Sequence, residues 1–305
     1  MSTYTVFLQQ LINGLTIGMI YALIALGYTM VYGVAQLINF AHGEVFMVGA
    51  YFGLLAYALL KVLGAQTNAF FLFLPGIFLF AMALTALLGV LIERFTYRPL
   101  RDAPRLAPLI TAIGVSFVLQ NAVMLIAGPA DKSFPAIVDV KQIFFSHVAF
   151  TNLQFVIMLV SLFLMVALHF FIKRTKMGKA MRAVADDREA ASLMGINVNH
   201  VIAVAFFIGS ALAGAGGIMF GMYYNTINFH DGYLAGLKAF TAAVLGGIGN
   251  IPGAMLGGVL LGVLETLGAG YLSSAWKNVF AFFILILILL FRPNGLLGSR
   301  NVKKV

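Results

Sequence analysis

The sequence predicts an all-α, polytopic integral membrane protein with about eight transmembrane helices, on the evidence of its composition, its long apolar runs and the grouping of its basic residues. Of the 305 residues, 62% are hydrophobic and 10% are charged, and the mean hydropathy is +1.00. Soluble domains are about 45–50% apolar and about 25% charged. A soluble chain of this composition would lack the polar residues to cover its surface, so we expect the whole chain, 1–305, to form one transmembrane domain.

Eight apolar runs are long enough to cross a hydrocarbon core, which takes about 20 residues of helix. They lie near 9–33, 44–62, 70–92, 107–127, 151–172, 201–223, 251–267 and 271–291. No Lys, Arg, Asp or Glu occurs in residues 1–43. Because a cleavable signal peptide begins with a positively charged region, we expect the first run to remain as a span.

A shorter apolar piece at 237–247 predicts a broken or re-entrant helix near 237–253. Four Gly and one Pro fall within 245–253, and such a run breaks a helix. Broken helices at membrane depth line transport pathways. The candidates for a pathway or gate are Gly246, Gly247, Gly249 and Pro252, and the alternative is a loop at the surface. The chain would then cross eight times, or nine times if the short helix pairs with its neighbour.

The basic residues indicate the orientation of the chain. Fourteen of the 19 fall in three segments, which are 94–105, 173–188 and the tail from Arg292. The positive-inside rule places these segments and the C-terminus in the cytoplasm, and the segment 128–150 outside. The net charge of +9 is therefore explained by topology, and no nucleic-acid partner is expected. The N-terminus lies inside for eight crossings and outside for nine.

Glycine pairs within the spans predict close helix packing. Small residues four apart allow two helix backbones to approach in lipid. The pairs are Gly14/Gly18, Gly217/Gly221, Gly249/Gly253, Gly253/Gly257 and Gly258/Gly262.

A polar segment, Asn39 to Glu44, stands between the first two spans. Asn39 can cap a helix, and Glu44 is favoured in the first turn of the next helix. Alternatively, Asn39, His42 and Glu44 line a pathway or move protons, because ionisable groups within membranes are usually functional. Glu265, in the seventh span, is a second candidate, and it can also pair with a nearby Lys or Arg.

The cytoplasmic loop 173–200 predicts a short, well-terminated helix. Asp186 and Glu189 have the spacing of a capping box, and Gly195 suits the left-handed position that ends a helix. Ala190, Leu193 and Met194 share one face. This small apolar face predicts a docking element for a partner protein, and the alternative is a helix lying on lipid headgroups.

Residues in this helix carry a family resemblance. Glu189, Ala190, Ala191 and Gly195 resemble the E-A-A-x-x-x-G coupling motif of ABC importer permeases, although Val198 and Asn199 stand where the I-x-L-P that follows in that family has Leu and Pro. Longer stretches are similar to LivH-type permeases of branched-chain amino acid importers. They are 27–33, 38–44, 93–99, 192–197, 238–249 and 292–296, and the similarity runs from about residue 7 to residue 298.

The resemblance implies a five-part importer in the bacterial plasma (inner) membrane. Its other parts are a homologous second permease, two ATP-binding subunits and an extracytoplasmic solute-binding protein. It implies that the helix at 186–195 docks on an ATP-binding subunit and that the solute is a branched-chain amino acid, although related permeases serve urea or short amides. No cofactor is expected in this chain, with ATP and Mg in the partner subunits, since Gly178-Lys179 is followed by Ala180 and lacks a phosphate-binding loop.

Two other classes of protein fit the sequence less well. A stand-alone secondary transporter or channel needs ion-coupling carboxylates, and the spans offer only Glu44 and Glu265. A membrane enzyme needs a catalytic group of residues, and neither H-E-x-x-H nor G-x-S-x-G occurs. The absence of cysteine excludes disulfides and thiolate metal sites.

Overall fold

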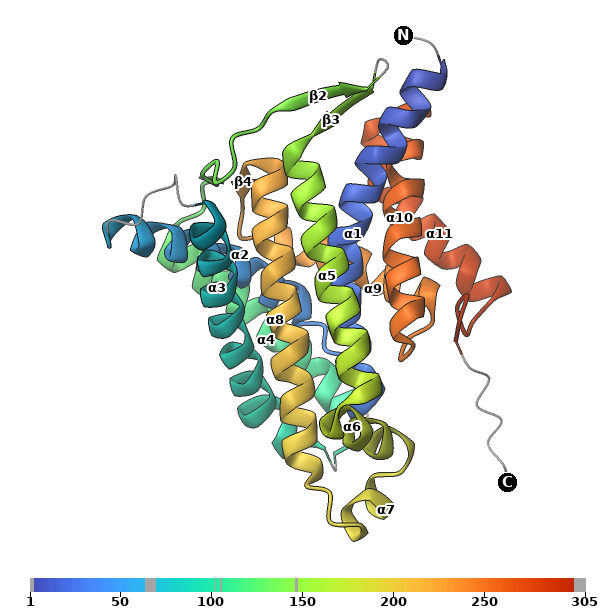
Figure 1. Cartoon of the computed structure of the whole chain (residues 1–305). Helices are drawn as coiled ribbons and strands as arrows, with labels where there is room; N and C mark the ends of the chain where they lie inside the picture. Colours follow the sequence, from blue (N-terminus) through green and yellow to red (C-terminus); the bar gives the residue numbers. More distant parts are fainter. Residues whose placement is uncertain (1–2, 64–69, 102, 105, 146–147, 299–305) are drawn as a thin grey trace.

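The computed structural model is a bundle of long helices (Figure 1) and describes residues 3–63, 70–101, 103–104, 106–145 and 148–298. Its α-helices are α1 (Thr3–Ala35), α2 (His42–Val62), α3 (Phe70–Ile92), α4 (Leu106–Ala127), α5 (Asn152–Arg174), α6 (Lys176–Asp186), α7 (Arg188–Leu193), α8 (Val198–Tyr224), α9 (Asp231–Gly246), α10 (Ile251–Tyr271) and α11 (Lys277–Phe291). Two antiparallel strand pairs join β1 (Lys132–Ser133) to β4 (Thr226–Ile227) and β2 (Gln142–Phe145) to β3 (Val148–Thr151).

Eight of these helices are long and apolar enough to cross a membrane, as the sequence predicts. The predicted boundaries differ by a few residues in most spans, and two of these differences come from short turns of another helix type. The third span continues past Ile92 through a π-helical turn, η1 (Glu93–Tyr97), and a 3-10 turn, η2 (Arg98–Leu100), because Tyr97 is buried against the bundle. The last span begins with a 3-10 turn, η3 (Ser274–Trp276), capped by the Ser273 hydroxyl, so that α11 starts only at Lys277.

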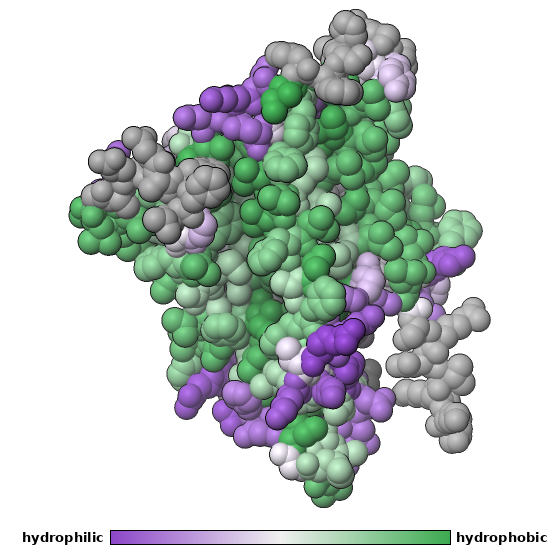
Figure 2. Space-filling model, viewed as in Figure 1, coloured by the Kyte–Doolittle hydropathy of each residue, from purple (hydrophilic) through white to green (hydrophobic). Residues whose placement is uncertain are grey.

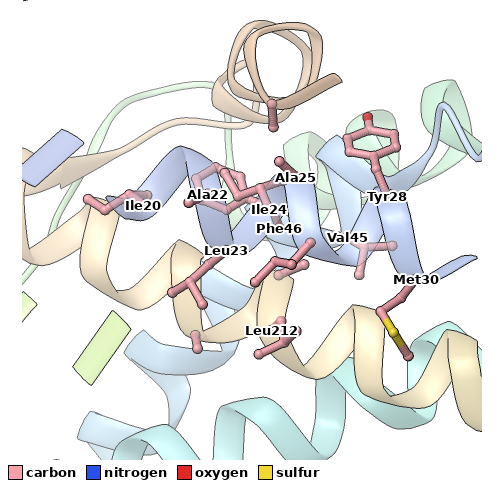
Figure 3. Packing of buried hydrophobic residues seen from close by; sticks show 14 of the residues in the cluster. Ile20, Ala22, Leu23, Ile24, Ala25, Tyr28, Met30, Val45, Phe46 and Leu212 are labelled. Atoms are coloured by element: carbon pink, nitrogen blue, oxygen red, sulfur yellow. The ribbon is translucent and has the colours of Figure 1, made fainter. Parts of the chain in front are cut away.

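Helix α1 forms the centre of the bundle. Its 18-residue apolar window is 89% buried, against 6% for α4 and for α11. Figure 3 shows side chains of α1, including Leu23 and Ile24, on the side of the helix where Phe46 of α2 and Leu212 of α8 lie. A helix that is apolar on every side belongs in such a position.

Glycine brings α1 and α10 into backbone contact. A Cβ added at Gly262 would overlap the backbone of Gly18, and one at Gly258 would overlap that of Ala22. A Cβ at Gly18 would lie 2.8 Å from the Cα of Val259. The pairs Gly14/Gly18 and Gly258/Gly262 thus pack helices, as predicted.

The two ends of the bundle differ in character. At one end, which we call the hairpin end, strands β2 and β3 pack on α1 through Gln9, whose side chain bonds both backbone groups of Ala149. At the other, the basic end, Arg101, Lys173 and Arg182 lie around one cavity. Arg105 and the tail residues Arg300, Lys303 and Lys304, which also entered the prediction of orientation, lie outside the described residues.

The short helix near 237–253 is confirmed. It is a separate helix followed by a turn, and not a single helix interrupted at mid-depth. Helix α9 begins at Asp231, just after β4 at the hairpin end, and reaches the basic end, where Gly249 packs against Gly33 of α1. Gly247 and Gly249 have φ of +105° and +90° and make the turn into α10. Helix α9 is not among the eight helices that are long and apolar enough to cross a membrane, yet it ends at the basic end, and α1 begins at the hairpin end.

One buried carboxylate joins four helices. Glu265 Oε1 of α10 accepts from Lys238 Nζ of α9 at 2.9 Å, from Lys277 Nζ of α11 at 3.2 Å and from Tyr21 Oη of α1 at 3.3 Å. The expectation that Glu265 pairs with a lysine is therefore confirmed. Since a lone charge in an apolar interior is costly, each lysine depends on this carboxylate.

We expect Gly262→Leu to prevent normal packing of α1 on α10. The new side chain meets backbone, which cannot move aside as a flexible side chain does, and overpacking of a core costs about 1–3 kcal/mol or more. Folded protein recovered in mild detergent and its thermal unfolding temperature should both fall. Gly114→Leu on α4 is the control, because a Cβ there meets nothing within 4 Å. Equal stability of the two variants would contradict the packing described.

We expect Glu265→Gln to destabilise the protein more than Lys238→Met does. Loss of the carboxylate leaves the buried Lys238 without its ion pair and the half-buried Lys277 with only the Tyr224 hydroxyl, and breaking a buried ion pair in this way costs about 3–5 kcal/mol. Lys238→Met leaves Glu265 paired with Lys277. Thermal unfolding of the purified variants checks the order, and an unfolding temperature for Glu265→Gln equal to that of Lys238→Met would show that the carboxylate does not hold the cluster together.

Candidate functional site

Helix α7 forms the tip of the basic end and is capped at its N-terminus by Asp187. The Asp187 carboxylate accepts from the backbone N–H groups of Glu189 and Ala190, at 2.8 and 3.0 Å. The predicted capping box of Asp186 with Glu189 is wrong by one residue, because Asp186 is the last residue of α6. The adjacent aspartates made this assignment ambiguous in the sequence, and the extended backbone of Asp187, with φ of −149°, decides it.

The C-terminus of α7 ends as the sequence predicts. Gly195 has φ of +81°, its N–H donates to Ser192 O, and the Ile196 N–H donates to Ala191 O. This pair of bonds is the Schellman motif, which favours glycine at the left-handed position. Six residues of helix are thus fixed at both ends.

The outward surface of α7 is apolar. Leu193 is 89% exposed and Met194 is 82% exposed, and Glu189 and Ala190 are exposed beside them. Ala191 is buried and packs the helix onto the bundle. In Figure 2, hydrophobic residues form the lowest tip of the molecule, beyond a band of hydrophilic ones. Large exposed apolar side chains in a polar setting mark an interaction site, so α7 presents a surface suited to a protein partner.

Side-chain bonds connect α6 and α7 to the end of α1. The Arg188 guanidinium donates to Ala35 O, and Gln36 Nε2 donates to Ala185 O at 3.2 Å. A displacement of α7 would therefore act directly on the segment that joins α1 to α2. These contacts were not predicted, because each pairs a side chain with a distant backbone carbonyl, which leaves no pattern in the sequence.

A cavity of about 1080 Å³ lies at the basic end. It is bordered by the ends of α1, α4 and α5, by α6, and by the turn between α9 and α10. Its charged lining is mostly basic, with Arg101, Lys173, Arg182, Arg188 and Asp186. Arg101 pairs with Glu93 and bonds Asn199. Burial lowers the pKa of Arg101, and the neighbouring Glu93 opposes that effect.

Only part of the glycine-rich segment 245–253 borders this cavity. Gly249 and Pro252 line it, together with Ile248 and Asn250. Gly246 packs on the backbone of Gly253, and Gly247 packs on Gly298, beside the backbone bonds from Leu296 and Leu297 to the end of α9. Two of the four predicted pathway positions thus border open space, and the other two allow close backbone contact.

Asn39 and His42 lie in the interior. Asn39 Oδ1 accepts from the Ala41 N–H at 3.0 Å and from the Tyr97 hydroxyl at 2.8 Å, so it holds the turn before α2. His42 stacks edge-on against Tyr28, with ring centres 4.8 Å apart, and fills the space beside Gly27. Neither residue borders the cavity, and their role as pathway residues stays a prediction.

Glu44 lies between α4 and α9. Its Oε1 is 3.4 Å from the Ser116 hydroxyl of α4, and its Oε2, which is buried over Gly232 of α9, has no hydrogen-bond partner among the described residues. Across the described part of the chain, no group of three His, Asp or Glu residues is placed to hold a metal ion.

Comparison with known proteins gives consistent matches. A family model for the permease component of branched-chain amino acid transport systems matches residues 10–289. The high-affinity branched-chain amino acid transport system permease protein BraD of Pseudomonas aeruginosa is 49% identical over 303 residues, 98% of each chain. LivH of Escherichia coli K12, of the same description, is 47% identical over 303 residues, also 98% of each chain.

A more distant relative is the probable branched-chain amino acid transport permease LivH of Methanocaldococcus jannaschii. It is 30% identical over 292 residues, which are 90% of this chain and 88% of the other. No solved structure matches. The near-complete coverage, together with the eight membrane-spanning helices, shows that the chain is a transport subunit, and not an enzyme, of the family of permease components of branched-chain amino acid transport systems.

Proposed function

We propose that this chain is one of two homologous permeases in an ATP-driven importer for branched-chain amino acids. The single observation that carries the proposal is α7, a rigid helix at the tip of the basic end with Leu193 and Met194 exposed. Two ATP-binding subunits would supply the energy, one of them docked on α7, and an extracytoplasmic binding protein would deliver the solute. The names of the relatives favour branched-chain amino acids over urea or short amides.

The mechanism we propose is alternating access. ATP binding brings the two ATP-binding subunits together and moves α7, and the bonds from Arg188 and Gln36 transmit that movement to the end of α1. The driving force is the different affinity of each permease state for the two nucleotide states. ATP and Mg would bind only in the partner subunits, with no cofactor in this chain.

The orientation we propose has the basic end in the cytoplasm of a bacterial cell, with the inner membrane as the site of the complex. Support comes from the three basic segments, since arginine and lysine accumulate on the cytoplasmic side. The hairpin end and the start of α1 would then face outward, where the binding protein docks.

Co-purification from native membranes tests this function. The tagged chain in mild detergent should bring down two ATP-binding subunits and a second permease. A Leu193→Asp, Met194→Asp double variant should lose the ATP-binding subunits and keep the second permease, because charge on the apolar face of α7 opposes docking without disturbing the helices within the membrane. A chain that purifies alone would favour the stand-alone transporter. If the double variant recovers the ATP-binding subunits as well as the parent does, α7 is not the docking element.

Gly195→Val should uncouple uptake from ATP hydrolysis. A β-branched residue at φ of +81° is strained by about 1–3 kcal/mol, so the end of α7 should rearrange. Leucine uptake should fall at least tenfold while the amount of chain in the membrane stays near normal. Gly128→Val is the control, with φ of +89° and open space at the opposite end of the bundle. Normal uptake by Gly195→Val would show that the geometry of α7 is not needed for coupling.

A further inference from the structure

The two least buried spans, α4 and α11, differ in the polarity of their surfaces. In each, 6% of the apolar window is buried inside the chain. From Val279 to Phe291, α11 is apolar without exception, as suits a helix facing lipid. Helix α4 instead carries Thr111, Ser116, Gln120 and Asn121. Thr111 and Asn121 bond carbonyls of their own helix, whereas Ser116 and Gln120 reach Glu44 and His230. Polar side chains within membranes face protein or water-filled space rather than lipid, so the face of α4 with Ser116 and Gln120 suits such a space.

Two contacts of α4 point toward α9. Gln120 Nε2 lies 2.8 Å from Nδ1 of His230, the residue just before α9, and Ser116 contacts Glu44, which lies over the first turn of α9. At the basic end, Leu109 of α4 and Ile248, just after α9, border the same cavity. Helices α4 and α9 therefore flank one strip of surface from the hairpin end to the basic end.

The exposed and half-buried side chains of α9 near this strip are mostly apolar, and the exposed Tyr233 adds a hydroxyl. Leu234 is exposed, and Leu237 and Phe240 are half-buried one and two turns further on. The ring of Phe240 lies 5.6 Å from that of Phe40, which is followed toward the basic end by Ile38 and Leu37 in the lining of the cavity. We name the set Ser116, Gln120, His230, Leu234, Leu237 and Phe240 the α4–α9 strip.

We propose that the α4–α9 strip is the wall that this subunit contributes to the solute path, with the second permease closing the path over α4. The inference rests on the function proposed above and adds the place where the solute passes. Its polar end holds an amide, a hydroxyl and an imidazole, and its apolar part leads through Phe40 toward Ile38 and Leu37, which line the cavity of about 1080 Å³.

The chemistry of the strip fits a zwitterion with an aliphatic side chain. Leu234, Leu237 and Phe240 offer such a side chain an apolar surface. Behind the polar end stand two carboxylates, Asp231 and Glu44, and the Oε2 of Glu44 is buried and lacks a hydrogen-bond partner among the described residues. A primary ammonium group next to Gln120 and His230 would lie in the electrostatic field of these two carboxylates.

The lack of cysteine makes this wall accessible to direct labelling. Single cysteines at Leu234 and Leu237 would be compared with single cysteines at Phe283 and Ile286 of α11, where the native residues are 56% and 55% exposed. The whole complex in native membranes is treated with a charged, membrane-impermeant methanethiosulfonate reagent. The strip cysteines should react at least tenfold faster than those on α11, and saturating L-leucine with the binding protein and ATP should change their rate severalfold.

A size test accompanies the labelling. Leu237→Trp should narrow the path and lower leucine uptake more than valine uptake, whereas Ile286→Trp should leave both unchanged. Strip cysteines that react no faster than those on α11, or a Leu237→Trp variant that slows both solutes equally, would overturn the assignment. The proposed function is judged separately by uptake in the cysteine-free parent, since a parent that imports no leucine fails as an importer whatever the labelling pattern.

Discussion

The close packing of a charge-free α1 against glycines of α10 is the constraint on which the rest of the structure depends. Because Gly258 and Gly262 allow the two backbones to touch, α10 lies along much of α1 and carries α9 with it as the other arm of a hairpin. The turn of that hairpin is thereby held against Gly33, beside the cavity at the basic end. One packing contact thus positions the short helix, the cavity and the end of α1 to which α7 is bonded.

Much of this arrangement follows from patterns that one sequence displays. Span length, glycine spacing and the left-handed position of Gly195 each express a local rule, so the eight long helices, the close packing at glycine pairs and the end of α7 could be predicted. That the glycines of α10 pack on α1 was not predicted. The assignment of Asp187 as the cap was not predictable, because two adjacent aspartates satisfy the same pattern. The links from Arg188 to Ala35 and from Gln36 to Ala185 join residues about 150 positions apart to backbone carbonyls, which have no residue identity to recognise.

The rotation of each helix about its own axis was the other feature that could not be predicted from the sequence. Asn39, His42 and Glu44 are close in sequence, yet Asn39 bonds Tyr97, His42 packs beside Gly27, and Glu44 turns toward α4 and α9. A polar cluster in a sequence therefore separates into different environments once the chain folds. Glu265 shows the opposite case, since Lys238 and Lys277, each isolated in the sequence, meet on one carboxylate and tie α9 to its neighbours.

The surroundings of Glu265 and the surface between α4 and α9 differ in polarity, and this difference bears on where selectivity between solutes resides. The buried carboxylate of Glu265 is already paired with Lys238 and Lys277, and this charged cluster serves the packing of α9 and α10. The surface between α4 and α9 has aliphatic residues and a few neutral polar groups, which give modest binding energy. A conduit needs modest binding, because a solute held tightly would leave slowly. In the importer that we propose, discrimination between solutes is then better placed in the separate binding protein, and the proposed permease wall needs only to accept what that protein delivers.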